Sequence, residues 1–104
     1  MKEAKDCQNI QEIRNAIDEI DYQLLSLFGK RNEYVREIVK FKSCKDEIVA
    51  KERQKEVIQN RKEWAIQFGL DPELFAEIYE TLIYWNVQKE MEIHCSMKKS
   101  NVKP

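Results

Sequence analysis

The sequence has few of the residues that form turns. Its 104 residues include two glycines and two prolines, and residues 10–42 contain no proline. Turns are rich in both residue types, and a sheet of many short strands needs a turn between each pair of strands. Hydrophobic residues make up 42% of the chain and charged residues 36%, a mixture typical of amphipathic helices and not of a disordered chain. The sequence therefore predicts an all-α protein.

The sequence also lacks an excess of either charge. It has 18 Lys and Arg residues against 19 Asp and Glu residues, for a formal net charge of -1. No overall basic field attracts nucleic acid or an anionic membrane, so we expect neither partner. An anionic ligand would have to be bound by a local cluster.

Cysteine and histidine are scarce and scattered. The three cysteines are odd in number and show no CxxC spacing, so we expect no disulfide framework, no zinc site and no other metal centre. His94 stands alone, and we expect it at the surface without a role. The N-terminus lacks the apolar core of a signal peptide, and no apolar run reaches the length of a membrane span. These features predict a soluble protein of the reducing cytoplasm.

One helical phase runs through residues 10–42. Alternate steps of four and three pass through six apolar and four ionisable residues: Ile10, Arg14, Ile17, Asp21, Leu24, Phe28, Arg31, Val35, Ile38 and Lys42. The phase is undisturbed at Gly29, so we expect one long N-terminal helix with a core-facing stripe. Asn9 and Glu12 have the spacing of a capping box at its start.

Three basic residues intrude on this stripe, and two interpretations stay open. The stems of Arg14, Arg31 and Lys42 can lie on apolar surface while their heads reach water or pair with Asp18 and Asp21. Alternatively, the three form part of a binding site. Three basic residues on one stripe favour the site.

The length of this helix predicts a dimer. It spans about 50 Å at 1.5 Å per residue, whereas a compact domain of this size is about 33 Å across. A second copy related by two-fold symmetry is the commonest way to bury such an overhang. Arg14 and Arg31 lie about 25 Å apart along the axis. If both hold one small molecule, Arg14 must come from the partner chain.

Two further helices complete a three-helix chain. A polar connection over residues 43–48 is either a surface link or a segment that closes over a ligand. The second helix spans residues 49–68 and ends at Gly69. Asp71 caps the third helix, which starts at Pro72 and runs to about Met97. We expect one domain over residues 1–104, with a core at about 6–97 and a frayed polar tail at 98–104.

Charged residues also interrupt the later helices. Arg53 extends by one turn the line through Val57, Arg61, Trp64 and Phe68. In the third helix, one face contains Phe75, Ile78, Leu82 and Trp85, and the adjoining face contains Tyr79, Ile83, Val87 and Glu90. A buried Glu90 favours its protonated form, which can donate a hydrogen bond. A surface Glu90 needs no explanation, and periodicity does not decide between the two.

Together the intruding charges indicate a ligand class. Guanidinium groups in a partly apolar setting match carboxylates in a two-pronged geometry, so we expect a small organic dicarboxylate. No serine, cysteine or histidine is placed as an activated nucleophile. Such a site suits a reaction in which charge redistributes within the substrate, helped by restraint and by stabilisation of the developing charge.

The sequence resembles the all-helical chorismate mutase family, and most closely its isochorismate-pyruvate lyase branch. The resemblance covers about residues 6 to 95 and lies in these segments: Ile13-Arg14, Ile17-Asp18, Ile20-Asp21, Arg31, Tyr34-Val35, Phe41-Lys42, Glu52-Arg53, Gly69-Leu70-Asp71 and Ile83-Tyr84-Trp85. It implies an intertwined homodimer of three-helix chains, with two sites that each use both chains, and a pericyclic reaction that needs no cofactor.

The resemblance also implies roles for the site residues. Arg14 of the partner chain and Arg31 would hold the substrate carboxylates, with Arg53 as a further basic residue. Lys42 would donate to a carboxylate and to the ether oxygen of the enolpyruvyl group. Glu90 falls where the lyase has glutamine, a donor to the same oxygen, and some chorismate mutases have glutamate there.

The choice of substrate depends on two positions of the second helix. Similar chorismate mutases have acidic residues at the positions of Ala50 and Gln54, which receive the ring hydroxyl of chorismate. The lyase branch has alanine at the first position, although Val49 and Lys51 replace its prolines. We therefore favour release of pyruvate from isochorismate to give salicylate, with conversion of chorismate to prephenate as a weaker activity. The alternatives are a chorismate mutase and a helical dimer without catalysis.

Overall fold

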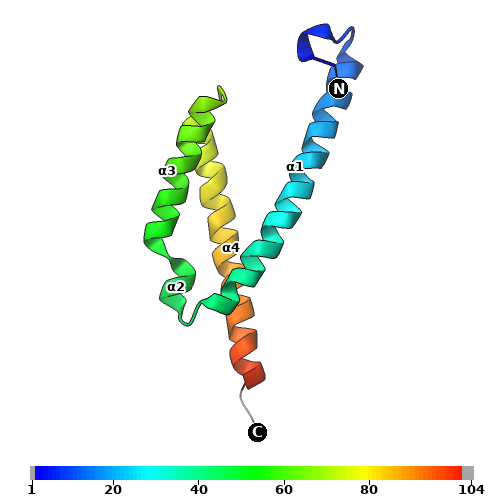
Figure 1. Ribbon diagram of the computed structural model, residues 1–104. Coiled ribbons are helices and arrows are strands. Elements are labelled where there is room, and N and C mark those ends of the chain that lie inside the picture. Colours follow the sequence, from blue (N-terminus) through cyan, green and yellow to red (C-terminus); the bar gives the residue numbers. More distant parts are fainter. Residues whose placement is uncertain (1, 102–104) are drawn as a thin grey trace. The chain divides into compact units, whose positions relative to one another are not determined.

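The computed structural model describes residues 2–101, with side chains for residues 2–98, and within this range it contains helices and no strand (Figure 1). The elements in chain order are η1 (Ala4–Asp6), α1 (Ile10–Ile38), η2 (Val39–Phe41), α2 (Lys45–Val49), α3 (Lys51–Gln67) and α4 (Pro72–Asn101). The predicted all-α class is confirmed. None of the described helices is long and apolar enough to cross a membrane. The chain divides into two compact units between Tyr34 and Val35.

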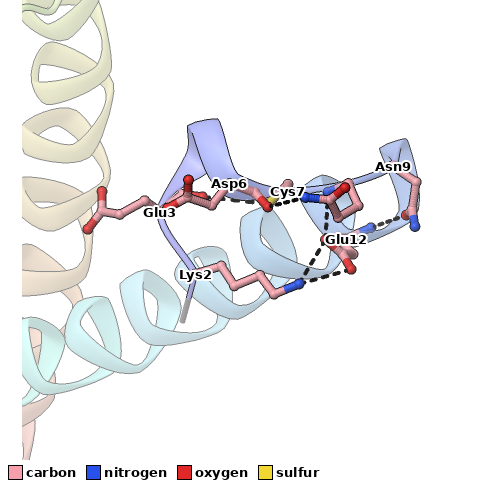
Figure 2. Close-up of polar contacts among 7 residues, drawn as sticks. Lys2, Glu3, Asp6, Cys7, Asn9 and Glu12 are labelled. Carbon is pink, nitrogen blue, oxygen red and sulfur yellow. Dashed lines mark hydrogen bonds and ion pairs between the residues drawn. The ribbon is translucent and has the colours of Figure 1, made fainter.

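The first unit starts with a short hook that folds back on the first turn of α1. Figure 2 shows that Glu12 bonds to several residues of this hook. The backbone N-H of Glu12 donates to Asn9 Oδ1 at 2.9 Å. The Glu12 carboxylate accepts from the backbone of Gln8 at 2.8 Å and from Lys2 Nζ at 3.2 Å. The predicted capping box is thus half confirmed. Asn9 caps the helix, but Glu12 reaches Gln8 and Lys2 instead of the Asn9 backbone.

α1 is continuous across Gly29, as its undisturbed apolar phase predicts. No residue of α1 is buried in the single chain. Its apolar side chains remain exposed, with Ile10 at 63%, Ile17 at 51% and Leu24 at 46%. Within the described part of the first unit, nothing covers the stripe predicted to face a core.

α1 ends earlier than its periodicity predicts. The backbone tightens into the 3-10 turn η2, Lys42 N donates to Val39 O at 3.1 Å, and Lys42 itself is extended. Val39 is 1% exposed, because η2 lies against α4 in the second unit. The prediction of a helix to Lys42 was therefore wrong for its last turn, where burial of Val39 determines the direction of the chain.

The second unit is a helical hairpin with a short helix before it. α3 and α4 run side by side in opposite directions, and α2 also packs on α4 (Figure 1). The buried apolar residues of this unit are Val39, Ile48, Val57, Ala65 and Ala76. Of the two faces predicted for α4, the one that contains Tyr79, Ile83, Val87 and Glu90 is the more buried. On the other predicted face, Ile78 and Trp85 are 36% and 58% exposed.

The polar connection predicted over residues 43–48 includes the first four residues of helix α2. Periodicity did not reveal it, because α2 is five residues long and a single apolar side chain, Ile48, anchors it. Ile48 is 1% exposed. Residues 43–47 are exposed, so Ile48 alone fastens this segment to the rest of the unit. The following helix starts at Lys51 instead of Val49, because Ala50 adopts a left-handed conformation between α2 and α3.

The boundary predicted at residues 69–72 is confirmed. Gly69 has φ +73°, and Leu70 N donates to Ala65 O at 2.7 Å, as in a Schellman motif. Asp71 Oδ1 accepts from the backbone of Glu73 at 2.9 Å and caps α4. α4 then continues to Asn101, so the predicted frayed tail is helical over residues 98–101. Residues 102–104 lie outside the described range.

We predict opposite effects for the same substitution at the two glycines. Gly69→Ala should lower the free energy of unfolding by about 1–2 kcal/mol, because an L side chain is strained at positive φ. Gly29→Ala is the matched control and should raise it by up to about 1 kcal/mol, because alanine favours a helix interior. An added Cβ meets no atom within 4 Å at either position. Urea denaturation measures both effects, and a stable Gly69→Ala variant would contradict the assigned cap.

Candidate functional site

The centre of the candidate site is an ion pair between Lys42 and Glu90. Lys42 follows η2 in an extended conformation, and Glu90 lies on the covered face of α4. Lys42 Nζ is 2.7 Å from Glu90 Oε1. The side chains are 16% and 7% exposed. Two residues singled out in the sequence as intruding charges are therefore in contact, and of the two alternatives left open for Glu90 the structure has the buried one.

The Lys42 ammonium has a second acceptor in the backbone. Ile48 O lies 3.5 Å from Lys42 Nζ, at the C-terminal end of α2. An ammonium group has three N-H donors. Glu90 and Ile48 use two of them, so one donor can serve a ligand. The sequence did not reveal Ile48 as part of the site, because a backbone carbonyl leaves no pattern in residue types.

A second carboxylate fixes the start of α2 beside Lys42. The Glu47 carboxylate accepts from Ser43 N at 2.9 Å and from Ser43 Oγ at 2.8 Å. These bonds, with the backbone bond first, lower the pKa of Glu47 below its usual 4.5, and the charge of Lys42 adds to the shift. The four-residue spacing of Ser43 and Glu47 was the available signal in the sequence.

Arg53 has a partner on its own helix. Its guanidinium pairs with Glu56 one turn later, and both side chains are well exposed. Arg53 also lines a hollow of about 480 Å³ at the junction of α2 and α3, together with Asp46, Val49, Ala50, Lys51 and Glu52. Arg53 is thus placed next to Ala50, one of the two positions on which the choice of substrate depends.

Arg14 and Arg31 belong to the first unit. Arg14 is exposed and Arg31 is partly buried, and both lie on the unbroken helix α1. Their separation along the axis is therefore about 25 Å. Two guanidinium groups of one chain at that distance do not reach the same small molecule. The site roles of all five residues, Arg14, Arg31, Lys42, Arg53 and Glu90, stay predictions.

His94 is buried at 8% exposure, so its expected place at the surface was wrong. It lies four residues after Glu90, one helical turn along the covered face of α4. That spacing was the signal for its burial, since side chains four apart share a helix face. Among the residues with described side chains, no group of three or more His, Cys, Asp or Glu side chains could hold a metal ion.

Comparison with known proteins gives two consistent matches. Residues 13–91 match the family model for chorismate mutase type II. The chain is also 32% identical over 92 residues to the isochorismate pyruvate lyase of Pseudomonas aeruginosa, covering 88% of this chain and 91% of that protein. The region matched by the family model contains most of α1 and all of α2 and α3, and it includes Lys42 and Glu90 of the ion pair.

We predict strong coupling between the two members of the buried pair. Lys42→Met should lower the free energy of unfolding by about 3 kcal/mol, because it leaves the Glu90 carboxylate buried without its counter-charge. The double variant Lys42→Met/Glu90→Met should recover most of that loss. A double-mutant cycle by urea denaturation measures the coupling, and additive effects would show that the pair does not stabilise the fold.

The cap on α2 should depend on pH. Because the pKa of Glu47 is lowered in the folded state, its stabilisation is present above the unfolded value and is lost as pH falls through the folded one. A carbon-13 titration of the carboxyl should give a midpoint below 4.5. In Ser43→Ala the midpoint should rise only part of the way, since the backbone bond remains. A normal midpoint in the unmodified protein would contradict the cap.

Proposed function

The chain belongs to the chorismate mutase type II family, and we propose that it catalyses a pericyclic reaction of isochorismate or chorismate. The activity that we favour is isochorismate-pyruvate lyase, which gives salicylate and pyruvate, with chorismate mutase as a weaker activity. The observation that carries the proposal is the Lys42 ammonium, largely buried beside Glu90 with one donor available. Both reactions rearrange bonds within one substrate, so neither needs an activated nucleophile or a cofactor.

Lys42 is suited to the step in which the ether bond breaks. Negative charge grows on the enolpyruvyl oxygen as that bond lengthens, and a nearby ammonium in a site that excludes water stabilises it. Glu90 and Ile48 O hold the ammonium before substrate arrives. Little reorganisation is then needed during the reaction, which is the condition under which such a charge accelerates a reaction most.

The substrate carboxylates are assigned to the arginines, and this assignment needs a second chain. The exposed apolar stripe of α1 supports an intertwined homodimer, because a partner would cover it. The separation of Arg14 from Arg31 supports a site to which the partner contributes Arg14. Arg53 would exchange Glu56 for a substrate carboxylate. Residues 1–104 then form one domain that is completed by the second copy.

The preference for isochorismate rests on the two positions of the second helix that could receive the ring hydroxyl of chorismate. Ala50 has no acceptor in its side chain. Gln54 can accept only as a neutral amide, and its Nε2 already donates to Val49 O at 2.6 Å. A site without its hydrogen-bond partner loses much discrimination for a hydroxyl. The similarity to the Pseudomonas aeruginosa lyase favours the same substrate.

Two other functions remain as alternatives. A chorismate mutase would form prephenate faster than it releases pyruvate from isochorismate. A helical dimer without catalysis would form neither product, and Arg14→Ala and Arg31→Ala would then change nothing except stability. Following pyruvate release from isochorismate beside prephenate formation from chorismate separates these alternatives from the favoured activity.

Mixing two inactive variants tests the shared site. We expect Arg14→Ala and Lys42→Ala each to lose activity, because each removes one group from every site. After unfolding and refolding together, they should recover about a quarter of the unmodified activity, since half of the dimers are mixed and each mixed dimer has one intact site. Pyruvate release measures the recovery. No recovery would contradict the contribution of Arg14 from the partner.

Glu90→Gln tests the role of Glu90 beside Lys42. A glutamine side chain can accept from Lys42 through its carbonyl and donate to the ether oxygen through its amide, as the glutamine of the lyase does in the resemblance. We therefore expect Glu90→Gln to keep pyruvate release. A rate as low as that of Lys42→Ala would contradict a donor at this position.

A further inference from the structure

The junction between α2 and α3 contains one strained residue. Ala50 has φ 45° and ψ 60°, and among the described residues it is the one non-glycine position with positive φ. Its N-H donates to Asp46 O at 2.8 Å, and its carbonyl accepts from Gln54 N at 3.0 Å. Ala50 thus ends one helix and starts the next. A left-handed conformation costs an L residue about 1–2 kcal/mol, so another contact has to hold the junction.

The Gln54 side chain provides that contact. Gln54 lies in the first turn of α3, and its Nε2 donates to Val49 O over 2.6 Å in a partly buried position. Val49 is the last residue of α2, and the last carbonyls of a helix have no partner within the helix. Gln54 therefore caps α2 from the next helix. We refer to the Gln54–Val49 bond as the latch.

The latch is one peptide away from the Lys42 site. The neighbouring carbonyl, Ile48 O, is the backbone acceptor of Lys42 Nζ. Ile48 and Val49 share a peptide plane, so a change at the Val49 carbonyl turns the backbone next to the Ile48 carbonyl. The buried side chain of Ile48 fixes where α2 lies on α4. With the side chain of Ile48 held, the last peptides of α2 could still rotate. The latch prevents this rotation.

We propose that Gln54 is a positioning residue, which aligns the Lys42 ammonium by holding the last turn of α2. The inference rests on the proposed function for its effect on catalysis, and on the contacts alone for its effect on Lys42. Gln54 is suited to this role because an amide can donate to a carbonyl. An ionised acid at this position could receive a substrate hydroxyl but could not donate to Val49 O, so the two roles exclude each other.

The test compares Gln54→Met with Gln59→Met. Methionine has nearly the length of glutamine but no donor, so Gln54→Met removes the latch with little change in volume. Gln59 is on the exposed side of the same helix and bonds to Glu63, away from the junction. Three quantities are measured in each variant: hydrogen exchange of the Ile48 and Ala50 amides, acetylation rate of Lys42 by mass spectrometry, and kcat and KM for pyruvate release.

In Gln54→Met we expect exchange of the Ile48 and Ala50 amides to rise about fivefold, as for the loss of one hydrogen bond. Acetylation of Lys42 should accelerate. The value of kcat should fall about tenfold while KM changes little, because the ammonium is misplaced for the reacting oxygen and the arginines still bind the carboxylates. Gln59→Met should resemble the unmodified protein in all three measurements.

Adding Ala50→Gly provides a rescue. Glycine adopts a positive φ without a steric penalty, so the junction should keep its geometry without the latch. In Gln54→Met/Ala50→Gly we expect amide exchange, acetylation of Lys42 and kcat all to return to their values in the unmodified protein. A destabilising packing defect at position 54 would not be repaired by this change, which removes only a methyl group at position 50.

Several outcomes would overturn the inference. Unchanged exchange in Gln54→Met would show that the latch does not hold α2. Faster exchange with unchanged acetylation of Lys42 would show that α2 does not position the ammonium. If the unmodified protein forms neither pyruvate nor prephenate, the proposed function fails. Exchange and acetylation then still decide whether Gln54 positions Lys42, so the two failures are distinguishable.

Discussion

The ion pair between Lys42 and Glu90 is the constraint on which the second unit depends. It joins the end of η2 to α4 across 48 positions of the sequence and lies almost out of reach of solvent. Removing two charges from water is costly, and a well-packed apolar pair of similar volume often stabilises a fold as well or better. Stability alone is therefore a weak reason for this pair. A stronger reason for the pair would be that it holds a positively charged donor in place for an anionic ligand.

The elements around the pair restrict the position of the ammonium from several directions. Val39 is buried and fixes the turn from which Lys42 emerges, and Ile48 is buried and fixes α2. Glu47 caps the start of α2 through Ser43, and Gln54 caps its end through Val49. Two buried side chains and two hydrogen bonds thus restrict the position of one ammonium group. A preorganised donor is the property that a reaction of redistributing charge requires.

Local signals in the sequence predicted the fold well where the cause of the structure is local. Gly69 and Asp71 determine their helix ends through their own backbone and side-chain chemistry, and both were identified correctly. The end of α1 and the existence of α2 depend instead on burial of Val39 and Ile48 against a distant helix. One buried residue in a short segment has no periodicity, so sequence patterns could not show it. The left-handed conformation of Ala50 was hidden because alanine, unlike glycine, does not indicate a positive φ.

The site was predictable in its residue types and not in its contacts. Lys42 and Glu90 stood out as charges on apolar stripes, but a pattern along each helix does not say which charges meet. The choice between a surface and a buried Glu90 was decided by the packing of α4 on η2 and α2. Ile48 O could not be found, because any residue has a carbonyl. Gln54 was noticed as a neutral side chain at a position where an acid is common, but not as a helix cap.

Pyruvate release by the neutral double variant Lys42→Met/Glu90→Met tests the central claim most directly. This variant keeps the volume of the buried pair and removes its charge, so loss of activity in a folded protein can be assigned to the charge. We expect a dimer with native circular dichroism that releases no pyruvate from isochorismate above the uncatalysed rate. Activity close to that of the unmodified protein would contradict the role of the Lys42 ammonium.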